Sequence, residues 1–256
     1  MVGVQAHPET AAPERARFLL CRPLGQEAVR SAAVFRVAGE RLAREGVSSL
    51  RFDYHGTGDS PGDEADQSLA DWIGDTLCAH EALREDAEDA VPVHWFGMGL
   101  GAVLALRAAL QAPQPPRHLV LWEPVFSGAD YLDALLNGHR EELAHMYSMA
   151  WEPLLASGKV EAPRLPGDVL GFHFGPQLVE ELRQLPPLPV LPALRRGLRI
   201  TCALAPGQPH PFENAQALPG LRLHTVEHPT NWMSSQAMGT AIAPPDIPRV
   251  LLSSLD

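Results

Sequence analysis

Apolar and polar residues follow one another along the chain in blocks that predict strands alternating with helices. Short apolar runs of strand length end at turn residues, and stretches in which apolar residues recur at helical spacing follow them. The predicted strands are ARFLLCR (16–22), VSSLRFDY (47–54), VPVHWFG (91–97) and RHLVLWEP (117–124), and the predicted helices cover 28–46, 67–87 and 102–111. This alternation predicts an α/β fold in which helices cover both faces of a parallel sheet.

The alternation stops after residue 125. Residues 126–196 show helical periodicity at 131–155 and 175–185, a Pro- and Gly-rich segment at 161–172 and a helix-breaking run, PPLPVLP, at 186–192. Strands resume with LRITCALA (198–205) and LRLHTVE (221–227), and a helical segment closes the chain. We therefore predict a core made of residues 1–125 and 197–256, with residues 126–196 inserted into it as a helical cap.

Composition narrows the class of partner. The chain has 31 acidic and 20 basic residues, which argues against binding to nucleic acid or to an anionic membrane and favours a small molecule or a protein. The three cysteines have no C-x-x-C spacing, and the histidines have no metal-binding spacing, so we expect neither a metal nor another cofactor. We find no apolar run of signal-peptide or membrane-spanning length and expect a cytoplasmic protein.

The segment FGMGLGA (96–102) predicts a sharp turn from a strand into a helix. Such elbows carry the pattern G-x-S-x-G, in which the Ser hydroxyl is a nucleophile, but here Gly99 occupies the middle position. A glycine relieves the strained backbone of the turn and cannot attack a carbonyl. The backbone N–H of Leu100, with an N–H near Leu24 or Gly25, could still form an oxyanion hole, because such donors do not depend on side chains.

Four segments resemble the α/β-hydrolase superfamily: RPLGQEAVRS (22–31), LRFDYHGTGDSPG (50–62), FGMGLGA (96–102) and LWEPVFSGADYLDALL (121–136). Within it, the chain is similar to the small bacterial serine-hydrolase-like proteins found beside exosortase systems and peptide or polyketide assembly lines. The resemblance implies an α/β-hydrolase fold with a helical cap. It also implies a Ser where this chain has Gly99, a base His after the last strand, and an Asp or Glu that orients the His.

The resemblance leaves several candidates for the base and the acid. His228, in VEHPTNW (226–232), is the candidate base, although His224 lies just before it and a loop His can equally be held by a carbonyl. Glu123 follows the strand directly, at a position that some superfamily members use for the acid, and Glu227 is a second candidate. The loop where the acid usually lies has no Asp, and Glu213 comes late in it.

Further residues are candidate ligand contacts. Met98 lies in the elbow, and His55 in the Gly-rich loop could point into the pocket. Aromatic and methionine side chains at helical spacing usually belong to a core, but a cap must also line its pocket with apolar groups. The cap offers six such residues, of which we single out Tyr147 and Trp151: Tyr131, Met146, Tyr147, Met149, Trp151 and Phe172.

Three functions remain open from the sequence. The first is a non-hydrolytic acid/base catalyst of elimination, isomerisation or cyclisation in bacterial secondary-metabolite biosynthesis, acting on a small-molecule or carrier-bound acyl substrate. The second is an inactive pseudo-hydrolase that binds a ligand, an acyl carrier or a partner enzyme. The third is an ester or thioester hydrolase that carries an engineered Ser-to-Gly change. Each is compatible with a monomer or a homodimer.

Overall fold

A computed structural model describes the chain except for residues 10–12, 86–90, 213–217, 228–229, 235–243 and 256. Among these described residues, seven strands form one sheet in the order β1-β3-β2-β4-β5-β8-β9, and only its β1–β3 pair is antiparallel. The strands are β1 (Val2–Ala6), β2 (Ala16–Cys21), β3 (Val47–Asp53), β4 (Val93–Met98), β5 (His118–Trp122), β8 (Arg199–Leu204) and β9 (Leu221–Thr225). The predicted α/β fold with a mostly parallel sheet is confirmed.

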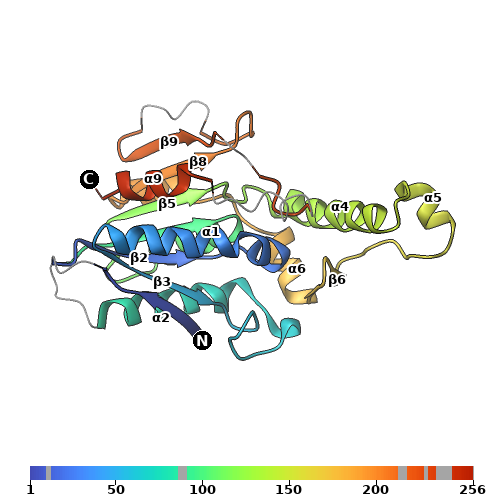
Figure 1. Ribbon diagram of the computed structural model, residues 1–256, viewed down its shortest axis with the longest axis horizontal. Helices are drawn as coiled ribbons and strands as arrows, with labels where there is room; N and C mark the ends of the chain where they lie inside the picture. The colour runs from blue at the N-terminus through green and yellow to red at the C-terminus, as the bar shows by residue number, and fades with distance from the viewer. Residues whose placement is uncertain (10–12, 86–90, 213–217, 228–229, 235–243, 256) are drawn as a thin grey trace.

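Helices cover both faces of this sheet (Figure 1). Along β2, Phe18 and Leu20 belong to one apolar cluster with residues of α1 and α9, whereas Leu19 and Cys21 belong to a second cluster with residues of α2 and α3. This division follows from the two-residue repeat of a strand, whose successive side chains point to opposite faces. The helices of the sheet layers are α1 (Gly25–Arg44), α2 (Leu69–Glu85), α3 (Leu100–Ala109) and α9 (Asp246–Ser253), with a short 3-10 helix at Glu64–Asp66.

Helix α1 begins at Gly25, three residues before the predicted start, and ends at Arg44, two residues before the predicted end at Gly46, which has a φ of 78°. The start of this helix is less buried than the rest of its apolar face. Val34 and Leu42 are buried, but Val29 is 56% exposed. Val29 lies near the start of the helix.

Residues 126–196 form more than the helical cap that we predicted. The helices are α4 (Gly128–Met146), α5 (Trp151–Ala156), α6 (Pro176–Arg183) and α7 (Val190–Arg195), and β6 (Gly167–Val169) pairs with β7 (Phe172–Phe174) as a hairpin. Positive φ angles at Leu170 and Gly171 close this hairpin in two residues. We missed the hairpin because its strands have three residues each, and PPLPVLP does not only break a helix but also begins α7.

Helices α4 and α5 form an arm that projects from the body of the molecule rather than a lid that lies over the sheet (Figure 1). The outer part of the arm exposes large apolar side chains, among them Met146, Tyr147 and Leu155. The sequence could not show this, because helical periodicity identifies the apolar face of a helix and not the direction in which the helix leaves the sheet. In the described part of the chain, no helix is long and apolar enough to cross a membrane.

A pair of buried histidines lies where β4 and β5 begin side by side. The rings of His94 and His118 are stacked with their centroids 6.4 Å apart. Neither ring nitrogen of His94 has a hydrogen-bond partner among the described residues. Burial lowers the pKa of His94 to about 4, and positive charges on neighbouring side chains add to this effect. Burial likewise lowers the pKa of His118 to about 4.

This pair should make the fold sensitive to acid. The unfolded chain takes up protons near pH 6.5 while the folded one resists them until about pH 4, so stability is lost as the pH falls through this window. In His94→Phe, which keeps a ring against Phe18, we expect the loss in unfolding free energy between pH 8 and pH 5 to be about 1–2 kcal/mol smaller than in the wild type. Urea unfolding at both pH values measures it. If the wild type and His94→Phe lost equal unfolding free energy between pH 8 and pH 5, the buried histidines would not cause the acid sensitivity. The same conclusion would follow if the exposed control His145→Phe reduced this loss as much as His94→Phe.

Candidate active site

The turn from β4 into α3 has the geometry of a nucleophile elbow without the nucleophile. Gly99 has φ 56° and ψ −123°, a conformation that is strained for any residue with a Cβ. Helix α3 begins at the next residue. Its N–H donates to the Trp122 carbonyl oxygen at 3.0 Å, which attaches the turn to β5. A Cβ at Gly97 would lie 2.6 Å from the Ala102 Cα, and one at Gly101 would lie 2.2 Å from the Arg22 carbonyl oxygen. The two flanking glycines are therefore required by close packing.

A carboxyl group lies where the missing side chain would point. A Cβ built on Gly99 would be 3.7 Å from Oε2 of Glu27 and 3.8 Å from its Oε1, with the Pro23 Cβ on another side at 3.5 Å. Glu27 stands in the first turn of α1, deep in the protein, yet it keeps partial contact with solvent. The Tyr131 hydroxyl, from α4, donates a hydrogen bond to Glu27 Oε2 at 3.2 Å. Helices α1 and α4 thus hold a carboxyl group in front of the elbow.

The environment keeps this carboxyl partly protonated at neutral pH. Burial raises the pKa of Glu27 to about 7; the Tyr131 hydrogen bond offsets part of the rise, and the negative charge of Glu123 adds to it. Burial also raises the pKa of the Tyr131 hydroxyl far above its usual value, and Glu27 increases that effect, so Tyr131 acts as a donor. A group with a pKa near 7 can accept and return a proton at the same pH, which is the property of a general acid/base.

Glu123 is the second carboxyl group of the site. It directly follows β5, where its N–H donates to the Ala203 carbonyl oxygen at 2.8 Å, and its φ of 43° is unusual for a residue with a side chain. Burial raises the pKa of Glu123 to about 7, and the neighbouring Trp122 indole offsets part of the rise. Its Oε1 has no hydrogen-bond partner among the described residues. Glu123 and Tyr131 line one open cavity of about 370 Å³.

The residues that we predicted as oxyanion donors lie at the start of α3 and in the turn before α1. Leu100 is the first residue of α3, so its N–H has no acceptor within the helix. Leu24 precedes α1 in extended conformation, Gly25 follows with φ 56°, and both line a cleft at the carboxyl ends of β2 and β3. The close approach of Gly101 to Arg22 brings this turn against the elbow. Whether the N–H groups converge on one substrate atom stays a prediction.

The side chains of four other predicted contacts line neither of the two cavities beside the elbow. Met98 is buried in the core beside Trp122, because as the last residue of β4 it points to the α1 face. The His55 backbone is held by Asp75 and Trp72, and its ring lies against Gly62 rather than in the cavities beside the elbow. Tyr147 and Trp151 stand at the junction of α4 and α5, in the projecting arm (Figure 1).

Among the described residues, the other candidates for the base and the acid do not form a catalytic triad. His228 and Glu213 lie outside the described residues. Glu227 is exposed and its N–H donates to Asp246, whereas His224 is half-buried on β9. Glu27 was missed because a Glu in the first turn of a helix ordinarily only complements the helix dipole. No group of three or more His, Cys, Asp and Glu suited to a metal occurs in the described part of the chain.

Comparisons with known proteins agree with this fold. The model of the family described as serine aminopeptidase, S33, matches residues 14–166. Two uncharacterized proteins from strains of Mycobacterium tuberculosis are each 40% identical over 86 residues. That match covers 33% of this chain and 29% of each of theirs, so the chain spans less than a third of the length of these relatives.

Similar solved structures extend over nearly the whole chain. Est1E from Butyrivibrio proteoclasticus with bound ferulic acid has a TM-score of 0.61 at 15% identity, covering 99% of this chain and 95% of that one. A carboxylesterase structure from Nitrososphaera gargenis has a TM-score of 0.60 at 14% identity, covering 98% and 93%. Alpha/beta hydrolase domain-containing protein 10 from mouse has a TM-score of 0.52 at 15% identity, covering 99% and 94%. The chain belongs to the S33 serine aminopeptidase family of the α/β-hydrolase superfamily.

Proposed function

We propose that this protein is an acid/base catalyst without a covalent nucleophile, and that Glu27 rather than a serine carries its chemistry. The observation that carries the proposal is the position of the Glu27 carboxyl, 3.7 Å from where a side chain of Gly99 would begin. A pKa of about 7 suits this group to take a proton from a substrate and to return it. Tyr131 holds the carboxyl, and Glu123 supplies a second proton-exchanging group nearby.

The reaction class follows from what the site offers. A carbonyl oxygen of a small-molecule or carrier-bound acyl substrate would accept from backbone N–H groups at Leu100 and at Leu24 or Gly25. Glu27 would then remove a proton next to that carbonyl. Elimination, isomerisation and cyclisation all proceed by such a proton transfer, and none requires an acyl-enzyme. A role in bacterial secondary-metabolite biosynthesis is the part of the proposal that rests on the resemblance alone.

One observation favours a second candidate, an inactive pseudo-hydrolase that binds a partner. The arm formed by α4 and α5 exposes apolar side chains, with Met146 67% exposed and Tyr147 42% exposed. Exposed apolar groups that lie close together are typical of protein-binding surfaces. A measurement of turnover separates the two candidates, because a binding protein catalyses no reaction.

The first test uses 5-nitrobenzisoxazole as a probe. A base removes its ring C–H proton, the N–O bond breaks, and the product is a cyanophenolate, so the reaction needs only one positioned base. We expect the wild-type rate to rise with pH through a midpoint near 7, since ionised Glu27 is the base. Glu27→Gln should lower the rate by about 10²-fold or more. Absorbance of the phenolate measures it.

Glu40→Gln is the matched control, because Glu40 is an exposed residue on the same helix and pairs with Arg36. Its rate should equal that of the wild type. An unchanged rate in Glu27→Gln, or a wild-type rate no higher than that of free acetate at the same concentration, would contradict the proposal and favour the binding function.

The second test restores the missing serine. In Gly99→Ser the new hydroxyl would lie within hydrogen-bond reach of Glu27, so we expect a slower proton transfer to the probe and no hydrolysis of p-nitrophenyl esters. The positive φ should also lower the unfolding free energy by about 1–3 kcal/mol, measured with urea. Gly158→Ser matches the positive φ but has nothing within 4 Å, so it should lose stability without losing turnover. Ester hydrolysis gained by Gly99→Ser would instead indicate an intact serine machinery and an engineered or recent loss.

A further inference from the structure

A second cavity, separate from the one beside Glu123, opens at the carboxyl ends of β2 and β3. Its walls come from the turn before α1, the end of β3, the start of α2 and the β6–β7 hairpin. Pro23 connects it to the elbow, because Pro23 lines this cleft and its Cβ lies 3.5 Å from the position of a Cβ at Gly99. A molecule with its reacting atoms at the elbow could therefore extend past Pro23 into the cleft.

The surface of this cleft is largely aromatic. Phe172 and Phe174, on the hairpin, face the turn at Gly25, where an added Cβ would lie 3.6 Å from the Phe172 ring and 3.7 Å from the Phe174 ring. Tyr54 and Trp72 also contribute to the lining, with their rings 5.8 Å apart, although both side chains are almost fully buried. Such rings present flat apolar surfaces that favour the faces and edges of another ring.

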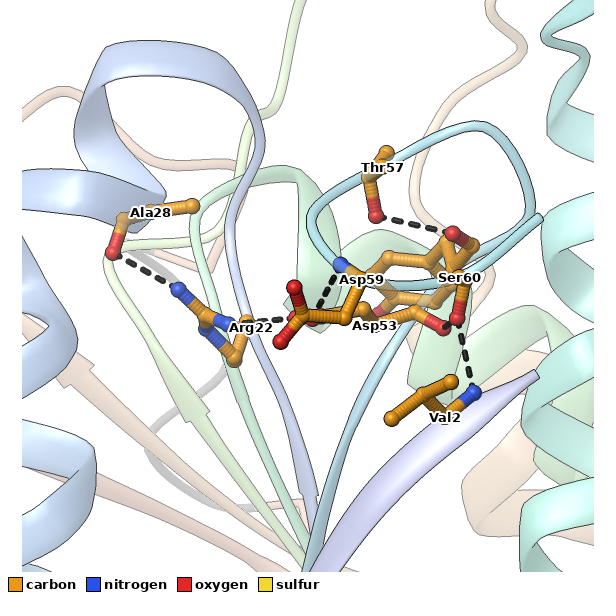
Figure 2. Close-up of polar contacts among 8 residues, drawn as sticks. Val2, Arg22, Ala28, Asp53, Thr57, Asp59 and Ser60 are labelled. Carbon is orange, nitrogen blue, oxygen red and sulfur yellow. Dashed lines mark hydrogen bonds and ion pairs between the residues drawn. The ribbon is translucent and has the colours of Figure 1, made fainter. Parts of the chain in front are cut away.

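Most polar side chains that border the cleft already bind other protein groups, whereas the buried Tyr54 hydroxyl has no hydrogen-bond partner among the described residues. Arg22 donates to Asp53 Oδ1 at 2.5 Å and to the Ala28 carbonyl oxygen at 3.1 Å, and Asp53 also accepts from the Asp59 N–H (Figure 2). Because the charges of Arg22 and Asp53 compensate each other, neither is free to bind an ion. The cleft therefore offers no unpaired charge from this pair to a ligand.

The described residues on the other side of the cleft offer no positive charge to a ligand either, although Glu64 brings a negative one. Gln67 Nε2 donates to the Gly56 carbonyl oxygen at 2.7 Å, and Glu64 Oε2 accepts from the His173 N–H at 2.8 Å. At the rim, the His173 ring binds Asp168 through Nδ1 at 2.7 Å. An anionic ligand would have to lose its own hydration without gaining a counter-charge from these groups, and that is costly.

The size of the cleft limits what can enter. It encloses about 110 Å³. This is less than the roughly 150 Å³ of an apolar cavity that holds benzene, so the cleft can take no more than one ring, with part of the ligand reaching out of the opening. Val29 lines the cleft and is 56% exposed, which places it at the opening. Its exposure on the first turns of α1 is explained if a ligand covers it.

We propose that this cleft binds an uncharged aromatic group of the substrate and thereby selects aromatic acyl compounds for the chemistry at Glu27. The proposal rests on the proposed function for the reaction, but the binding itself does not. The hairpin β6–β7, rather than the projecting arm, then determines specificity. A ring held in the cleft against Phe172 would have Pro23 between it and the elbow, so its substituent could extend past Pro23 toward Gly99.

Titration calorimetry with benzyl alcohol and with benzoate tests the binding. The two probes have the same ring and differ in charge. We expect the wild type to bind benzyl alcohol at least about tenfold more tightly than benzoate. Phe172→Ala and Val29→Lys should each weaken the binding of benzyl alcohol by about tenfold. The first removes part of the cleft wall, and the second places a charge at the opening. Leu191→Lys, an equally exposed apolar residue on α7 that does not line the cleft, is the control and should bind as the wild type.

Kinetics with 5-nitrobenzisoxazole, itself an uncharged aromatic compound, connect the cleft to the reaction. Val29→Lys should raise KM and leave kcat near the wild-type value, whereas Glu27→Gln should lower kcat and still bind benzyl alcohol. Benzoate binding as tight as benzyl alcohol, no benzyl alcohol binding, or binding unchanged in both Phe172→Ala and Val29→Lys would each overturn the cleft proposal. Probe binding without turnover would overturn the catalytic function alone.

Discussion

The turn at Gly99 is the constraint on which the rest of the site depends. It reverses the chain from the central strand β4 into α3 in a conformation that only glycine adopts without cost, and it is held to β5 by one backbone hydrogen bond. The flanking glycines let α3 pack against β4 and let the turn before α1 approach the elbow. That approach brings Glu27 into the space in front of Gly99. The elbow therefore keeps its shape and its position in the sheet, while the reactive group comes from another element.

The two carboxyl groups and the two buried histidines affect the pH dependence of stability in opposite directions. Glu27 and Glu123 have pKa values raised to about 7, so the stability that they contribute is present in acid and is lost as the pH rises from about 4.5 to 7. His94 and His118 have pKa values lowered to about 4, so they cost stability as the pH falls from about 6.5. The carboxyl groups line the functional end of the sheet, and the histidines lie at the starts of β4 and β5. Burial is the main cause in all four cases, but only the carboxyl groups have a role in the proposed reaction.

Much of the core could be predicted from the sequence, because strand–helix alternation and the glycines at 97, 99 and 101 are local signals. The antiparallel edge strand β1 was not predicted, since its residues are mostly exposed and show no buried face. The hairpin β6–β7 and the direction of the arm depend on tertiary contacts that no periodicity records. Of the site, Gly99 could be singled out from the elbow pattern, and Glu123 and Leu24 or Gly25 from the resemblance to the superfamily; the roles of these residues stay predictions. Glu27 could not be found, because its meeting with Gly99 and Tyr131 joins three elements that are distant in sequence.

The protonation of Glu27 tests the central claim most directly. Carbon-13 NMR of side-chain carboxyl groups in protein labelled at glutamate, with the signal assigned by its absence in Glu27→Gln, follows that one group through a pH titration. The account predicts a midpoint near 7 for Glu27, with a further inflection as Glu123 titrates beside it. A midpoint near 4.5, the ordinary value for a glutamate, would contradict it, because the carboxyl would then be a fully ionised surface charge at neutral pH and not an acid/base group in place of the nucleophile.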